Sequence, residues 1–168
     1  MPIFRRERRR RVPGPEGAFR WVVTRQLLDG VLASAASALP NEFGAVLRAD
    51  PPGVISEMLL VPGTTAGRRH ANFQFYMLHA DLSVVGTVHS HPSGALHPSG
   101  ADVQLFRNWG SRHLILGRPF GPSSWRAYDS RGEPVPLPVV GPDGTVEGTL
   151  PEGRPRPAIH RGDDPPVP

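Results

Sequence analysis

The sequence contains no cysteine and no lysine, and each absence removes whole classes of function. Without cysteine the chain forms no disulfide, and it offers neither a thiolate nucleophile nor a cysteine ligand for zinc or an iron–sulfur cluster. Without lysine it has neither a Walker-type phosphate loop nor a Schiff-base nucleophile. All 19 basic side chains are therefore arginines.

Long hydrophobic runs are also missing. No stretch approaches the roughly 18 consecutive apolar residues of a membrane-spanning helix. The basic N-terminal residues are followed by Val12-Pro13-Gly14-Pro15, whereas a secretory signal needs an apolar stretch of about 7–15 residues at that point. We therefore expect a soluble, cytoplasmic protein.

The positive charge is concentrated at one end of the chain. Residues 1–13 contain six arginines and one glutamate, whereas the rest of the chain has 13 arginines and 14 acidic residues. The net charge of +4 therefore comes from an N-terminal arm. Such arms are usually solvated tails, and binding of nucleic acid through this arm is the less favoured interpretation.

A chain of 168 residues fits one domain. Its 21 prolines and 19 glycines favour short strands and turns over a helical bundle. Composition divides the chain into three parts: a disordered basic arm over residues 1–17, a folded domain over 18–140, and a Pro/Gly-rich flexible tail over 141–168.

The apolar patterns predict helices interleaved with strands. Thr24 can cap a helix that runs to Ala38, and a second helix is expected over 99–109. Strands are expected over 18–23, 42–48, 54–61, 72–78, 82–89, 113–116 and 124–128. This order predicts a single α/β or α+β domain with a mixed β-sheet flanked by helices.

The main candidates for functional residues lie at the end of the expected strand over 82–89 and just after it. Residues i and i+2 of a strand share a face, so His89 and His91 point to the same side. Two imidazoles on one face can bind a zinc ion at about 2.0–2.1 Å each. Ser90 points to the opposite side and is not a candidate for the site.

A third ligand is expected from the helix that follows. Ser99 and Asp102 share one helical face through their i, i+3 spacing, and the turn over 92–98 can bring that face back over the end of the strand. Two histidines and a carboxylate, with a fourth position left for water, make a hydrolytic zinc site. Ser99 and Asp102 can equally form a helix N-cap with an acid in the first turn. The two interpretations are compatible.

The run His89-Ser90-His91-Pro92, followed by Ser99 and Asp102, resembles the signature of the JAMM, or MPN+, zinc metalloprotease family. These are deubiquitinase-like isopeptidases, and the chain is most similar to the compact archaeal and bacterial type. The resemblance covers about residues 19–130. It implies a JAMM/MPN+ catalytic domain with a cytidine-deaminase-like fold and one zinc ion per chain, held by His89, His91 and Asp102.

The resemblance also implies the catalytic residues. The family uses a glutamate on an early strand, and Glu42 is the matching position; without the motif it would be read as an exposed strand carboxylate. Glu42 is expected to take a proton from the zinc-bound water and pass it to the leaving amine. Ser99 is expected to donate a hydrogen bond to the oxyanion.

Three functions remain open from the sequence. The first, implied by the resemblance, is a zinc isopeptidase that removes ubiquitin-like modifier proteins from target lysines, like a desampylase or deubiquitinase. The second is a peptidase that processes the C-terminus of a sulfur-carrier protein and releases cysteine. For both of these functions, we expect a partner protein with a Gly-Gly C-terminus as the substrate. The third is a non-catalytic MPN binding module whose Arg arm binds nucleic acid, with the salt dependence of such contacts.

Overall fold

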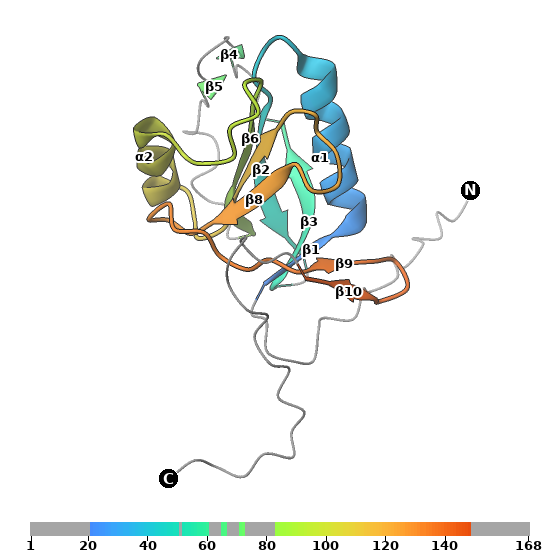
Figure 1. The fold of residues 1–168 in the computed structure, drawn as a ribbon. Helices are drawn as coiled ribbons and strands as arrows, with labels where there is room; N and C mark the ends of the chain where they lie inside the picture. Colours follow the sequence, from blue (N-terminus) through green and yellow to red (C-terminus); the bar gives the residue numbers. More distant parts are fainter. Residues whose placement is uncertain (1–20, 51, 61–64, 67–70, 73–82, 149–168) are drawn as a thin grey trace, which may run out of the picture.

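A mixed β-sheet organises the part of the chain that the computed structural model describes, which comprises residues 21–50, 52–60, 65–66, 71–72 and 83–148 (Figure 1). The strand order in this sheet is β10-β9-β1-β3-β2-β6-β7-β8. Helix α1 packs on one face, where its apolar residues join β2, β6 and β7 in the main core. Helix α2 packs through Phe106 against Ile115 and Tyr128 on the β7 and β8 side of the sheet.

The bounds of the elements follow the sequence expectations closely. The helices are α1 (Arg25–Ala38) and α2 (Gly100–Asn108), and the strands of the main sheet are β1 (Val22–Thr24), β2 (Gly44–Ala49), β3 (Val54–Leu59), β6 (Val84–His91), β7 (His113–Gly117), β8 (Trp125–Tyr128), β9 (Val139–Val140) and β10 (Val146–Glu147). A separate pair consists of β4 (Thr65–Ala66) and β5 (Ala71–Asn72). The strand expected over 72–78 lies outside the described residues beyond Asn72.

Helix α1 forms as its sequence predicts. The hydroxyl oxygen of Thr24 accepts a hydrogen bond from the backbone N–H of Leu27 at 3.2 Å, which satisfies one of the free donors of the first turn. The buried residues of the helix recur every three or four positions and form one stripe: Leu27, Leu28, Val31, Leu32 and Ala35. This stripe covers the sheet face opposite the one that carries the histidines.

Strands β2, β6 and β7 bring the candidate site residues to one edge of the sheet. β6 pairs antiparallel with β2, with Gly44 opposite His89, and parallel with β7, with His91 opposite Gly117. The end of β6, the end of β7 and the start of β2 therefore meet at the same edge. β6 ends at His91, two residues beyond the end expected from the sequence, so both histidines lie on the strand itself.

Gly86 in β6 is required by a close approach of the chain. A Cβ at this position would lie 1.6 Å from the carbonyl oxygen of Arg112. The segment before β7 crosses β6 here, and the backbone N–H groups of Ser111 and Arg112 donate to the carbonyl oxygen of Val85 at 2.9 and 3.1 Å. Glycine at position 86 thus allows β7 to enter the sheet beside β6.

Residues 141–148, the first part of the predicted Pro/Gly-rich tail, are described and form part of a hairpin. β10 pairs antiparallel with β9, and the turn between them is closed by Asp143, whose Oδ1 accepts from the N–H and hydroxyl of Thr145 at 3.1 and 2.7 Å. The Arg25 guanidinium on α1 also forms an ion pair with Glu147. Backbone pairing and a local Asx turn therefore extend the sheet in a segment that has few apolar residues. Residues 149–168 and the arm over 1–17 lie outside the described residues.

In the described parts of the chain, none of the helices combines the length and the apolar character needed to cross a membrane.

Candidate metal centre and active site

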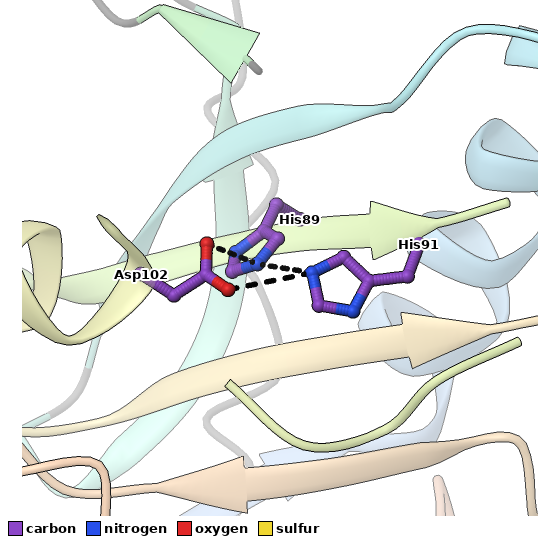
Figure 2. A group of neighbouring side chains, drawn as sticks. All are labelled: His89, His91 and Asp102. Atoms are coloured by element: carbon purple, nitrogen blue, oxygen red, sulfur yellow. Dashed lines mark hydrogen bonds and ion pairs between the residues drawn. The ribbon is translucent and has the colours of Figure 1, made fainter. Parts of the chain in front are cut away.

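Three side chains from two elements converge at the edge of the sheet where β6 ends (Figure 2). The Nε2 atoms of His89 and His91 lie 3.1 Å apart. Asp102, in the first turn of α2, places Oδ1 3.1 Å from Nε2 of His89 and Oδ2 3.5 Å from Nε2 of His91. Tetrahedral zinc with bonds of about 2.0–2.1 Å holds its ligand atoms about 3.3 Å apart. The arrangement therefore has the spacing of a zinc site.

The tautomer of His91 and the packing of His89 suit metal binding. Nδ1 of His91 lies 2.9 Å from the carbonyl oxygen of Ala95, which only accepts, so Nδ1 carries a hydrogen and, in the neutral ring, Nε2 keeps its lone pair for a metal. His89 is almost fully buried, with 4% of its surface exposed. Its Nδ1 has no hydrogen-bond partner among the described residues. Packing therefore orients this ring, which lies 6.0 Å from the ring of Phe106 between centroids.

The charges of the site favour an ionised carboxylate beside the imidazoles. Burial tends to raise the pKa of Asp102, but hydrogen bonds from His89 and His91 outweigh it and hold this pKa well below its usual range. The pKa of His91 is raised, chiefly by its hydrogen bond to Asp102 and, against the effect of burial, also by the charges of Asp102 and Glu42. A negative field at the two imidazoles is what a divalent cation requires.

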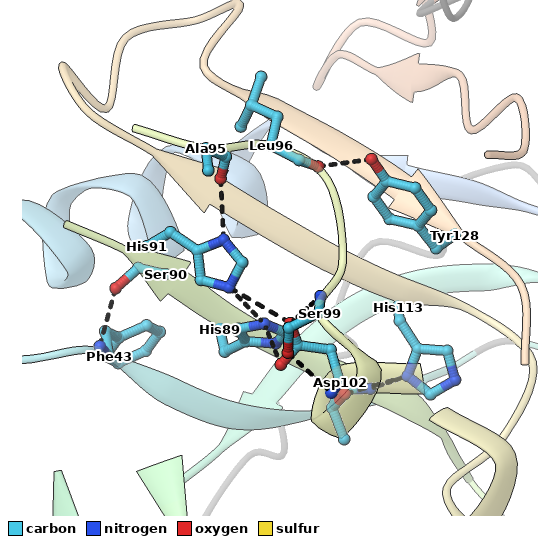
Figure 3. A network of polar contacts seen from close by, with 11 residues as sticks. Phe43, His89, Ser90, His91, Ala95, Leu96, Ser99, Asp102, His113 and Tyr128 are labelled. Carbon is cyan, nitrogen blue, oxygen red and sulfur yellow. Dashed lines mark hydrogen bonds and ion pairs between the residues drawn. The ribbon is translucent and has the colours of Figure 1, made fainter. Parts of the chain in front are cut away.

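Ser99 and Asp102 form a capping box at the start of α2 (Figure 3). The Ser99 hydroxyl oxygen accepts from the backbone N–H of Asp102 at 3.2 Å, and Asp102 Oδ2 accepts from the backbone N–H of Ser99 at 2.6 Å. Because the cap uses only the oxygen of the Ser99 hydroxyl, its proton is available to another acceptor. The structure confirms the N-cap expected from the sequence, and this cap orients the Asp102 carboxylate toward the histidines, where it could also hold a metal ion.

The loop between β6 and α2 is fastened at two points (Figure 3). The His91 ring binds the carbonyl oxygen of Ala95, and the Tyr128 hydroxyl on β8 donates to the carbonyl oxygen of Leu96. Gly117 allows the loop to lie close to β7, because a Cβ there would meet the carbonyl oxygen of Gly94 at 2.7 Å. Sequence reasoning missed Tyr128, since no local pattern links a strand tyrosine to a loop 32 residues away.

Two aromatic rings behind the site connect α2 to the sheet. Phe106 is fully buried one turn after Asp102, and its ring stacks on that of His113 with centroids 4.1 Å apart. His113 Nδ1 accepts from the backbone N–H of Thr87 at 3.2 Å, two residues before His89. Burial lowers the pKa of His113 to about 4, so its ring is neutral at physiological pH. These contacts fix the helix that carries Asp102 against the strand that carries His89.

Glu42 lies beside the histidine pair by register. Gly44 is opposite His89 in the antiparallel pairing, and the backbone carbonyl of Phe43 accepts from the N–H of Ser90 at 2.9 Å. Glu42 directly precedes Phe43, so continuing this register beyond the start of β2 would bring Glu42 to His91, on the face that carries the histidines. The effect of the Glu42 charge on the pKa of His91 agrees with this placement. The structure therefore brings all five expected residues to one edge of the sheet.

Comparison with known proteins gives the same class. The chain matches the family of prokaryotic homologues of the JAB domain over residues 24–129. A curated relative, a probable metalloprotease of Haloferax volcanii, is 37% identical over 125 residues, covering 69% of this chain and 77% of the relative. A JAB1/MPN domain protein from Archaeoglobus fulgidus superimposes with a TM-score of 0.58 at 35% identity, covering 71% of this chain and 97% of that chain.

A second solved structure, of a protein described as JAMM, a metalloprotease-like zinc site in the proteasome and signalosome, gives a TM-score of 0.57 at 35% identity with the same coverage. Fold and site together define a metal-dependent hydrolase built on an α+β fold. The chain belongs to the JAMM/MPN family of metalloproteases, of the prokaryotic JAB type, and its two imidazoles and one carboxylate fit zinc.

Proposed function

We propose that the protein is a zinc-dependent isopeptidase of the cytoplasm that removes ubiquitin-like modifier proteins from target lysines, like a desampylase or deubiquitinase. The observation that carries the proposal is the convergence of His89, His91 and Asp102, whose ligand atoms all lie within 4.8 Å of one another on a JAMM/MPN fold. The proposed substrate is a carrier protein with a Gly-Gly C-terminus.

In this proposal the neutral Nε2 atoms of His89 and His91 and the Asp102 carboxylate hold zinc. When bound, zinc polarises the scissile carbonyl and lowers the pKa of a coordinated water from about 9 toward about 7. The Asp102 carboxylate partly offsets the cation charge, and its capping bond to Ser99 keeps it oriented.

Glu42 acts as the general base and then as the general acid. Two observations support this role: Gly44, two residues after Glu42, pairs with His89, and the Glu42 charge contributes to the raised pKa of His91. It takes a proton from the attacking water and delivers it to the lysine amine that leaves. A positioned acid–base group of this kind contributes about 10²–10⁴-fold to the rate.

Ser99 stabilises the negative charge that develops on the substrate oxygen. Its exposed hydroxyl lies at the N-terminus of α2, where the helix dipole also favours negative charge. The peptide C–N bond breaks as the amine receives its proton, which releases a free lysine side chain and the carboxylate of the modifier.

The test is cleavage of a panel of Gly-Gly-terminated carriers, each joined to a lysine isopeptide, a linear peptide or a single cysteine. We expect the isopeptide to be cleaved fastest, and a chelator to stop cleavage until zinc is restored. Preference for the cysteine conjugate would instead assign the processing of sulfur carriers. Cleavage that resists the chelator would refute the zinc mechanism.

Site variants separate binding of the metal from chemistry. His89→Ala and Asp102→Ala should lose zinc, measured by metal analysis against about one zinc per wild-type chain. Glu42→Gln should keep zinc and lose at least about 100-fold in kcat. Asp29→Asn, which changes an exposed acid on α1, is the matched control and should retain both. Full turnover by Glu42→Gln would exclude the general-base role.

A further inference from the structure

Ser90 is a fully buried hydroxyl that the proposed mechanism does not use. It lies on β6 between the two histidines, and its side chain points to the opposite face of the strand from theirs. The expectation from sequence therefore excluded it from the site. A buried hydroxyl group needs a hydrogen-bond partner, and the partner of Ser90 indicates what this residue does.

The partner is the backbone next to Glu42. The N–H of Phe43 donates to Oγ of Ser90 at 2.8 Å (Figure 3). The N–H of Ser90 in turn donates to the carbonyl oxygen of Phe43 at 2.9 Å. Two bonds thus join Ser90 of β6 to Phe43, the residue that follows Glu42. β2 begins one residue later, at Gly44, so this pair holds the chain just before the regular strand starts.

We propose that Ser90 is a positioning residue that sets the place of the Glu42 carboxylate relative to the metal ligands. His89 and His91 flank Ser90 on β6. The two hydrogen bonds between Ser90 and Phe43 therefore act as a clamp that fixes the position of Glu42 relative to both histidines. The inference rests on the proposed function for the role of Glu42. A general base displaced by about 1 Å can lose roughly 100-fold in rate, so such a clamp has a measurable effect.

The main variant is Ser90→Ala, which removes the acceptor and leaves the strand otherwise intact. We expect kcat on the isopeptide-linked carrier to fall about 10- to 100-fold, with KM and zinc content unchanged. Ser90→Thr keeps the hydroxyl and should restore most of kcat. In the metal-free protein, hydrogen exchange of the Phe43 amide measured by NMR should speed up roughly tenfold in Ser90→Ala and remain slow in Ser90→Thr.

The matched control is Ser83→Ala. Ser83 Oγ accepts from Nε of Arg48 on β2 at 2.8 Å, so this variant removes a comparable bond between the same two parts of the sheet at the far end of β6. Its kcat should equal that of the wild type, with a similar change in thermal stability. Equal losses of kcat in the two serine variants would show general loosening of the sheet and overturn the proposal.

Other outcomes also decide the inference. Full kcat in Ser90→Ala, an unchanged exchange rate of the Phe43 amide, or a loss of rate that follows a loss of zinc would each overturn it. A wild-type protein that cleaves none of the carriers would refute the proposed function. The exchange measurement needs no turnover, so it tests the clamp separately from the reaction.

Discussion

At the scale of single residues, the site depends on side chains that have two tasks. Asp102 Oδ1 approaches His89 while Oδ2 accepts the Ser99 N–H, and the Ser99 hydroxyl caps α2 while its proton remains available. Substitutions at these positions therefore combine a structural cost with a chemical one. The two costs can be separated by variants that keep one task and remove the other.

Ser99 offers the clearest separation. Ser99→Ala removes both the cap and the hydroxyl donor, so we expect about 1 kcal/mol lower stability and a loss of about 10²–10³ in kcat. Ser99→Thr keeps both groups and should change neither greatly. Chemical denaturation and steady-state kinetics measure the two effects. A rate loss no larger than about twofold in a folded Ser99→Ala protein would contradict the oxyanion role.

At the scale of elements, α2 is positioned from behind by Phe106. The helix has nine residues, and Phe106 is its fully buried side chain, four residues after Asp102 and on the same face. The Phe106 ring contacts the rings of His89, His113 and Tyr128, which come from three different strands. The orientation of the carboxylate thus depends on one aromatic contact as well as on the cap.

Phe106→Ala should therefore lower both stability and affinity for zinc. We expect a loss of about 3–5 kcal/mol of unfolding free energy from the cavity, and weaker zinc binding in the folded fraction because α2 shifts. Phe106→Leu should give smaller effects of the same kind, and Gln104→Ala on the exposed face should give none. Denaturation curves and zinc titration measure both quantities; unchanged zinc affinity in folded Phe106→Ala would contradict the positioning argument.

At the scale of the whole molecule, buried His113 makes the fold sensitive to acid. Its folded pKa is about 4 against an ordinary value of 6.5, mainly because burial disfavours the charged ring. The folded state binds this proton less well than the unfolded state, so the stability from neutral His113 is complete above about pH 6.5 and falls until about pH 4. The difference of about 2.5 pKa units corresponds to about 3 kcal/mol.

The variant His113→Asn tests this contribution. Its amide oxygen can still accept the Thr87 N–H but does not titrate. Unfolding free energies of the metal-free proteins, measured from pH 7 to pH 4, should fall more steeply for the wild type. The other titrating groups are shared, so the difference between the curves belongs to His113. Parallel curves would show that His113 does not cause the sensitivity.

The N-terminal arm belongs to the same scale. The family match begins at residue 24, and the six arginines of residues 1–13 precede it. Deleting residues 1–12 should therefore leave zinc content and cleavage of a small isopeptide substrate unchanged. A loss of cleavage in the deletion variant, with zinc retained, would assign the arm a role in the reaction.

The sequence by itself predicted both helices, six strands of the main sheet, and the four candidate site residues that lie close together in the chain, His89, His91, Ser99 and Asp102. These predictions rest on local patterns, which can be found in the sequence without the fold. They are the stripe and cap of α1, the shared face of His89 and His91, and the i, i+3 spacing of Ser99 and Asp102. Glu42 could be selected only through the resemblance to the family, because 47 residues separate it from His89.

Only the tertiary structure decided how these pieces meet. The register of β2 on β6 sets Gly44 opposite His89, and the hydroxyl of Ser90 binds the backbone N–H of Phe43, next to Glu42. Tyr128 and Phe106 contact the loop and the helix that carry Asp102 into the site. The β9–β10 hairpin likewise continues the sheet past residue 140 through backbone bonds. Pairings between distant strands depend on the whole packed sheet, so no local pattern specifies them.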